Sequence, residues 1–243
     1  MHYRDLCITH KAFWNLEPRA KFYDQYMKEA KDWKKWPDAV SLQEIEKLLR
    51  FIPKWDGHFR GKDPEKFSNV YSAALPVIKE LEHEKLETAK LDAEQLQKIS
   101  KVFDALSRYS EQAYESTDCS KILHTILPDL IVMWDREIRK GIVGNENRKE
   151  AEIYAFNFLP KMQIELKEAI GTCMEAEMLG FEEAARYIRK SCGFESLPKL
   201  IDEHNYVIYT RLADFRFYLE SLKQRNEIRN EDCDRLKTKL PRI

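Results

Sequence analysis

Apolar residues recur every three or four positions along most of the chain, which is the period of an amphipathic α-helix. The clearest example begins at Ser41, which has a glutamate three positions later, as in a capping box, and precedes a run of apolar residues on one helix face. Asp63 and Pro64 have the order of an N-cap and a first helical residue, and Asp92 opens a further helix. Pro76 should kink or divide the helix that Asp63 begins.

The second half of the chain continues this pattern. A short helix is predicted over about 119–127, where Pro128 ends it, and the next helix begins near Asp135. Longer helices are predicted over 148–170 with a kink at Pro160, over 181–190 and over 197–225. Helices therefore account for most of the predicted regular structure.

Glycine usage supports the same fold class. The 243 residues include only 7 glycines, and none lies between Gly61 and Gly141. Sandwiches and doubly wound sheets need more tight turns than this, so the chain is expected to be all-α. We expect one compact multi-helix unit over 1–243. Weak boundaries at 56–64 and 141–150 allow two interlocked lobes with a central cleft, formed by 1–62 plus 145–243 and by 63–144.

Several classes of protein are disfavoured. The 5 cysteines are odd in number and form no CxxC pair, which favours free thiols in a reducing compartment and hence a cytoplasmic protein. No secretory signal is evident, and no apolar run approaches the roughly 18–20 residues that span a bilayer. P-loop, Rossmann and Gly-x-Ser-x-Gly sequences are also absent, and no cofactor is expected. No metal is expected either, because the chain has no HExxH sequence and the adjacent Glu203 and His204 of the 202–205 cluster should point in different directions.

The densest group of unusual residues lies within 116–142. Lys121 and His124 are three positions apart and share one helix face. Asp135 has the position of an N-cap, so its carboxylate should lie at the positive end of the following helix dipole. Each residue also has a purely structural interpretation: a capping Asp135, a solvated Lys121, and a His124 and a Trp134 that belong to the core.

This segment resembles the helix-hairpin-helix DNA glycosylase superfamily in the order of a Lys, an apolar helix, a turn and a capping Asp. It is also similar to a motif of uncharacterised archaeal and bacterial proteins that includes the later 201–206 segment. The resemblance implies that Asp135 stabilises positive charge on the sugar or orients water, and that Lys121 is a Schiff-base nucleophile or a phosphate-positioning cation. Arg139 would extend the helix beneath and supply a supporting ion pair. The hairpin segment 114–121 contains no glycine, so serine and threonine side chains would replace the backbone donors of the family.

Other residues could grip DNA or enclose a flipped base. Trp134 and His124 flank the proposed catalytic pair, and the loop 54–62 combines aromatic, cationic and glycine residues, which suits contact with a base or phosphate. Two residues of a later polar cluster could face the same cleft as Asp135. The candidates from the loop and this cluster are Trp55, His58, Arg60, Asp202 and Asn205.

The sequence therefore predicts a DNA glycosylase that hydrolyses the N-glycosidic bond of a flipped, damaged or modified base. The formal net charge of −1 gives no overall attraction to DNA, although residues 1–62 and 211–243 each contain more cations than anions. Two alternatives stay open: a non-catalytic nucleic-acid-binding helical protein and a helical protein-interaction module.

Overall fold

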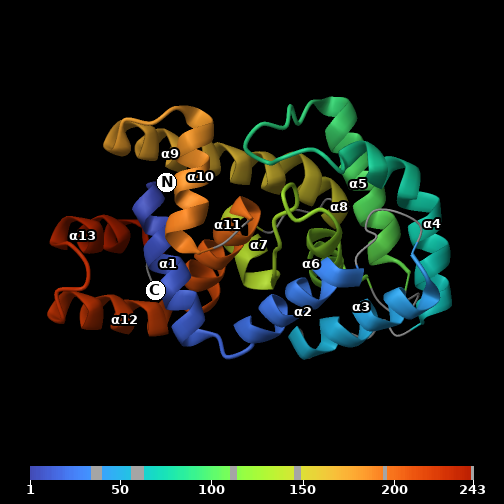
Figure 1. Cartoon of the computed structure of the whole chain (residues 1–243), viewed down its shortest axis with the longest axis horizontal. Helices are drawn as coiled ribbons and strands as arrows, with labels where there is room; N and C mark the ends of the chain where they lie inside the picture. Colours follow the sequence, from blue (N-terminus) through green and yellow to red (C-terminus); the bar gives the residue numbers. More distant parts are fainter. Residues whose placement is uncertain (34–39, 56–62, 110–113, 145–148, 194–195, 242–243) are drawn as a thin grey trace.

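The computed structural model describes the chain except for residues 34–39, 56–62, 110–113, 145–148, 194–195 and 242–243. Within the described ranges the regular structure is entirely helical, with no β-strand, so the predicted all-α fold is confirmed (Figure 1). None of the helices in these ranges combines the length and the apolar character needed to span a bilayer.

Fifteen helical elements make up the described part of the chain. The first seven are α1 (Tyr3–Leu16), α2 (Ala20–Trp33), α3 (Leu42–Trp55), α4 (Pro64–Leu81), α5 (Ala93–Ser107), α6 (Ser116–Ile126) and α7 (Arg136–Val143). Those that follow are α8 (Glu150–Ile153), η1 (Tyr154–Phe158), α9 (Leu159–Glu177), α10 (Phe181–Cys192), α11 (Leu197–Asn205), η2 (Tyr206–Thr210), α12 (Leu212–Gln224) and α13 (Asn230–Lys239).

The predicted helix starts are confirmed by their capping contacts. Ser41 Oγ accepts from the backbone N–H three residues later at 3.3 Å, and that glutamate returns a carboxylate oxygen to the Ser41 N–H at 2.6 Å. Asp63 caps α4 and Asp92 caps α5. Pro76 does not divide α4, which is one helix to its end, because its apolar face is buried along both halves.

Two π-helical turns lie within the predicted helices 148–170 and 197–225. η1 and Pro160, which lies in the first turn of α9, replace the kink expected within 148–170. η2 divides the predicted helix 197–225, and its end is marked by an Arg211 N–H that donates to the carbonyl of Tyr206 at 3.1 Å. A π-turn holds one residue more than an α-turn, and this change of register is common at functional sites.

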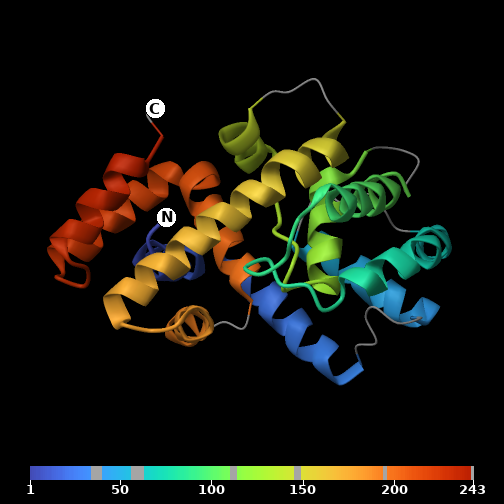
Figure 2. The same cartoon turned by 90° about the horizontal axis from the view of Figure 1, so that it is seen from above.

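The helices enclose two clusters of buried apolar residues. The larger cluster takes side chains from α1 through α11, and the smaller one lies between α1, η2, α12 and α13. Figure 2 shows α9 running diagonally along the molecule, with α12 and α13 at one end and α3 and α4 at the other. Helix α1 contributes Leu6 to the larger cluster and Phe13 to the smaller, so it joins the two. The lobe boundaries and the central cleft stay predictions.

A buried carboxylate fastens α13 to α1. Asp5 is fully buried, and its two oxygens accept hydrogen bonds from Arg235 at 2.8 Å and from Lys239 at 3.0 Å. Burial alone would raise the pKa of Asp5, but the bonds from Arg235 and Lys239 outweigh it and hold that pKa below its usual value. The contact joins residues 230 positions apart.

Two of the five free cysteines lie against each other. Cys7 of α1 and Cys192 of α10 have their Sγ atoms 3.0 Å apart. The hydrogen bond from Cys192 lowers the pKa of Cys7 against the opposing effect of burial, and Lys11 lowers it further. Cys7 is also the one cysteine of the five that is not classed as buried. It should therefore react first with a peroxide.

We expect dilute hydrogen peroxide to join Cys7 and Cys192 in a disulfide. The two thiols lose two hydrogens and the peroxide is reduced to water, so intact-mass spectrometry should record a loss of about 2 Da. Cys233→Ser is the matched control and should still lose this mass, whereas Cys7→Ser should not. A gain of oxygen in the wild-type protein without the loss would contradict the prediction.

Candidate functional site

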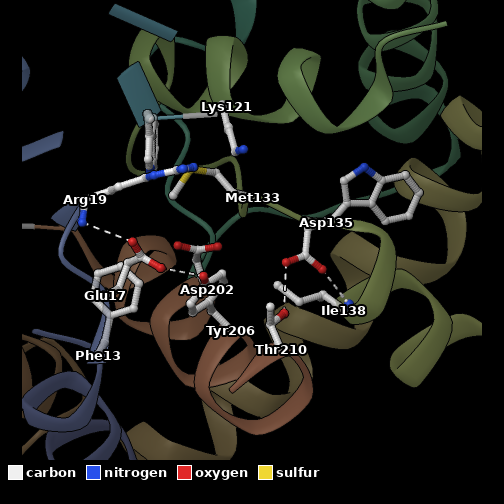
Figure 3. A pocket seen from close by; sticks show the side chains of 12 residues that line it. Phe13, Glu17, Arg19, Lys121, Met133, Asp135, Ile138, Asp202, Tyr206 and Thr210 are labelled. Atoms are coloured by element: carbon white, nitrogen blue, oxygen red, sulfur yellow. Dashed lines mark hydrogen bonds between the residues drawn. The ribbon is translucent and has the colours of Figure 1, made fainter. Parts of the chain in front are cut away.

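A pocket of about 350 Å³ is lined by residues of α1, α3, α6, α7, α11 and η2 and of the segments that follow α1 and precede α7 (Figure 3). This volume is within the range of roughly 300–1,000 Å³ that is usual for small-molecule sites. Its lining consists of Phe13, Glu17, Arg19, Trp55, Lys121, Met133, Trp134, Asp135, Ile138, Asp202, Tyr206 and Thr210. The pocket thus brings together Lys121, Asp135 and Asp202, as the sequence predicted, and also Trp55 and Trp134.

Asp135 caps α7, as predicted, and its carboxylate is held at both oxygens. Oδ1 accepts from the backbone N–H of Ile138 at 2.8 Å, and Oδ2 accepts from the hydroxyl of Thr210 at 2.9 Å. The first contact places the carboxylate at the positive end of the α7 dipole. The second connects it to η2, so α7 and the π-turn together determine where the carboxylate points.

Lys121 reaches into the pocket from the α6 side (Figure 3). Its Nζ lies 5.8 Å from the centroid of the Trp55 ring, within the range of a cation–π contact. The resemblance places the lysine at the start of its helix, but α6 begins at Ser116 and Lys121 lies in the second turn. The lysine therefore approaches the pocket from the side of the helix rather than from its N-terminus.

Asp202 enters the pocket from the opposite side, on α11 (Figure 3). Its Oδ2 accepts from the ammonium of Lys199 at 2.8 Å. Burial raises the pKa of Asp202 to about 6, against the opposing effect of Lys199. The pocket therefore contains two aspartates in different surroundings, since Asp135 is bonded to a backbone N–H and a hydroxyl.

A third carboxylate, which the sequence analysis did not single out, lines the wall formed by the end of α1. Glu17 Oε2 accepts from the hydroxyl of Tyr206 at 2.6 Å and from Arg211 at 3.2 Å. Its other oxygen accepts from the backbone N–H of Arg19 at 3.0 Å. The charged residues that line the pocket are thus two cations, Lys121 and Arg19, and three carboxyl groups, those of Glu17, Asp135 and Asp202.

Aromatic residues form the rest of the wall. Trp134 is only 1% exposed and packs against the rings of Phe103, Tyr154 and Phe158 at centroid distances of 6.0, 5.2 and 5.3 Å. Its indole N–H donates to the carbonyl of Ser116 at 3.4 Å. Trp134 therefore serves as a core residue and as pocket wall at once, with its ring fixed on several sides.

Two of the predicted base-pocket residues lie in the core instead. His124 is fully buried; its Nδ1 donates to the carbonyl of Ile131 at 2.6 Å, which leaves Nε2 to accept from the Tyr23 hydroxyl at 2.7 Å. Asn205 is also buried, and its amide contacts the sulfur of Met162 at 3.0 Å. Neither residue lines the pocket. His58 and Arg60 lie outside the described residues.

Arg139 faces a second, smaller hollow of about 200 Å³ that shares Trp134 and Asp135 with the first. It forms an ion pair with Glu150, which also accepts from the hydroxyl of Ser116. Ser120 is fully buried and bonds to the backbone of Trp134 at 3.2 Å. The serine and threonine side chains expected to act as donors in the hairpin are those of Ser116, Thr117 and Ser120. Ser116 and Thr117 line this hollow, and Thr117 is only partly buried.

Comparison with known proteins identified no relative of the chain. No family model matches the chain, and neither a curated protein nor a solved structure matches it. Among the described residues no group of three or more His, Cys, Asp or Glu side chains could hold a metal ion. An interpretation of the pocket therefore depends on its own side chains.

Proposed function

We propose that the protein is a DNA glycosylase and that the pocket receives a base flipped out of the duplex. The observation that carries the proposal is the Asp135 carboxylate, which is fixed at both oxygens and lines a pocket with Lys121. Extruded bases are usually held between aromatic or apolar side chains, and Trp55, Trp134 and Tyr206 would supply such surfaces.

The chemistry proposed for Asp135 is electrostatic. When the bond between C1′ and the base breaks, its electron pair leaves with the base and positive charge develops on the sugar. A carboxylate already fixed in position stabilises this charge without having to reorganise. Water then adds to C1′ and loses a proton, which gives the free base and an abasic sugar.

A panel of duplexes tests this function. Each duplex contains one uracil, oxidised, alkylated, hydroxymethylated or glucosylated base, and the product is scored as abasic sites. Base release from at least one duplex is expected. Salt-dependent binding without release from any duplex would instead favour the non-catalytic nucleic-acid-binding alternative. Absence of binding would favour the protein-interaction alternative.

We propose that Lys121 acts either as the nucleophile that attacks C1′ of the sugar or as a cation that positions the phosphate. If it is the nucleophile, borohydride should trap the protein covalently on a duplex from which it releases a base, because the reagent reduces the Schiff base between Nζ and C1′. Lys121→Arg keeps the charge but cannot form this adduct, so trapping should disappear. Trapping that persists in this variant would assign the nucleophile to another amine. Base release without any trapping would make Lys121 a positioning cation.

A further inference from the structure

Asp202, which lines the pocket, belongs to a buried group of charged side chains on α11. Lys199 is 1% exposed, and its Nζ is 2.8 Å from Asp202 Oδ2 and 3.3 Å from Glu203 Oε1. The ammonium also lies over the rings of Phe13 at 4.4 Å and Tyr23 at 5.2 Å. The Lys199 ammonium therefore pairs with two carboxyl groups and also contacts two aromatic rings.

The charges of this group call for one additional proton. If both carboxyl groups were ionised and the nearby His10 were neutral, one negative charge would be left beside Lys199 in a largely desolvated site, which is costly. Glu203 has a second partner, because its Oε2 lies 2.6 Å from Nδ1 of His10. Asp202 has the pocket on its other side, where Asp135 and Glu17 add negative charge and Lys121 and Arg19 add positive charge.

Asp202 and Asp135 thus differ in what surrounds them. Both oxygens of Asp135 accept hydrogen bonds, one from a backbone N–H and one from a hydroxyl. Asp202 is buried, and the nearby Glu203 and Asp135 add to the effect of burial in raising its pKa, while Lys199 opposes it. Two carboxyl groups in such different surroundings commonly divide the roles of acid and base.

We infer that Asp202 is the general acid of this pocket and gives its proton to the departing base. The inference rests on the proposed glycosylase function. As the C1′–N bond breaks, its electron pair moves to the base, the base takes the proton from Asp202, and the new carboxylate is stabilised by Lys199. Water adds to C1′ and gives its proton to the Asp135 carboxylate. Solvent then returns the proton from Asp135 to Asp202, so each turnover consumes one water.

The first test is single-turnover base release as a function of pH, on a duplex that the wild-type protein cleaves. The acid must be protonated to act, so the rate should fall as pH rises above about 6, by roughly tenfold per unit. Asp202→Asn keeps the size of the side chain and a hydrogen-bond donor but has no proton to transfer. It should bind the duplex with a Kd close to that of the wild type, release base about 10²–10⁴-fold more slowly and lose this limb of the pH profile.

The second test does not need activity. Infrared difference spectra of the wild-type protein, recorded between pH values just below and just above 6, where carboxyl groups of ordinary pKa stay ionised, should contain a protonated-carboxyl band that is missing from Asp202→Asn. Asp92→Asn is the matched control, because it changes an aspartate outside the pocket, and it should retain the band. Circular dichroism establishes that each variant is folded.

The outcomes separate the inference from the proposed function. Base release by Asp202→Asn at the wild-type rate, or a band unchanged in that variant, overturns the inference while the glycosylase function stands. Failure of the wild type to release any base overturns the function and the transfer step together. A band lost only in Asp202→Asn, together with slowed release, supports the inference.

Discussion

Replacement of Asp135 by asparagine is expected to slow base release by about 100-fold or more while the fold is kept. The variant removes the negative charge that the proposed function places opposite the sugar, and a fixed charge opposite a developing one commonly contributes a factor of that order. Asparagine is nearly the same size and can still accept from the Ile138 N–H, so α7 should form. Even a complete loss of capping would cost only about 0.5–2 kcal/mol of unfolding free energy.

Another capping aspartate provides the control for this experiment. Asp92 accepts from the N–H of Gln95 at 2.9 Å at the start of α5, and it does not line the pocket. Asp92→Asn should have a similar small effect on the melting temperature and none on base release. If the wild-type protein is active and Asp135→Asn releases base at the same rate, the charge of Asp135 does not accelerate the reaction.

Replacement of Gly141 by alanine is expected to destabilise the protein by about 1–3 kcal/mol, the usual effect of overpacking. A Cβ at this position of α7 would lie 2.2 Å from Cδ1 and 2.4 Å from Cε1 of the Tyr209 ring. Tyr209 belongs to η2, so we expect relief of the clash to separate α7 from the π-turn. The bond between Asp135 and Thr210 crosses this same contact, and base release should fall as well.

Gly171 provides the matched comparison, because it lies inside α9 with open space where its Cβ would be. Gly171→Ala should stabilise the protein by about 0.5–1 kcal/mol, since alanine loses less backbone entropy in a helix. Urea titration of the two variants measures both effects. Equal stability of Gly141→Ala and the wild type would mean that Tyr209 yields without moving η2.

The sequence was sufficient to predict the helical class and the residues with strong local signals. Asp63, Asp92 and Asp135 cap helices because each stands directly before a helical run, which is a local property. The meeting of Lys121 with Asp135 was expected from the resemblance to the helix-hairpin-helix glycosylases. The place of Asp202 in the same pocket was predicted from its position in a polar cluster.

The remaining wall of the pocket could not be predicted in this way. Glu17 and Phe13 come from α1, and their neighbour Tyr206 lies 189 positions beyond Glu17. The spacing of apolar residues along the chain cannot predict a contact between residues so far apart in the sequence. The π-turn η2 shifts the helical register, so counting by 3.6 residues from α11 gives the wrong face for Thr210. For His124, helical spacing indicated a shared face with Lys121 but not that Tyr23 would cover it.

The attachment of α13 to α1 has a consequence for synthesis on the ribosome. At roughly 5–20 residues per second, about 10–50 s pass between translation of Asp5 and translation of Arg235. During this interval the carboxylate of Asp5 lacks its cationic partners, and the face of α1 that contains Phe13 has no C-terminal helices to cover it. Helix α1 leaves the ribosome well before α13, yet its contacts are completed only when α13 arrives, and the wall of the pocket that α1 forms is completed with them.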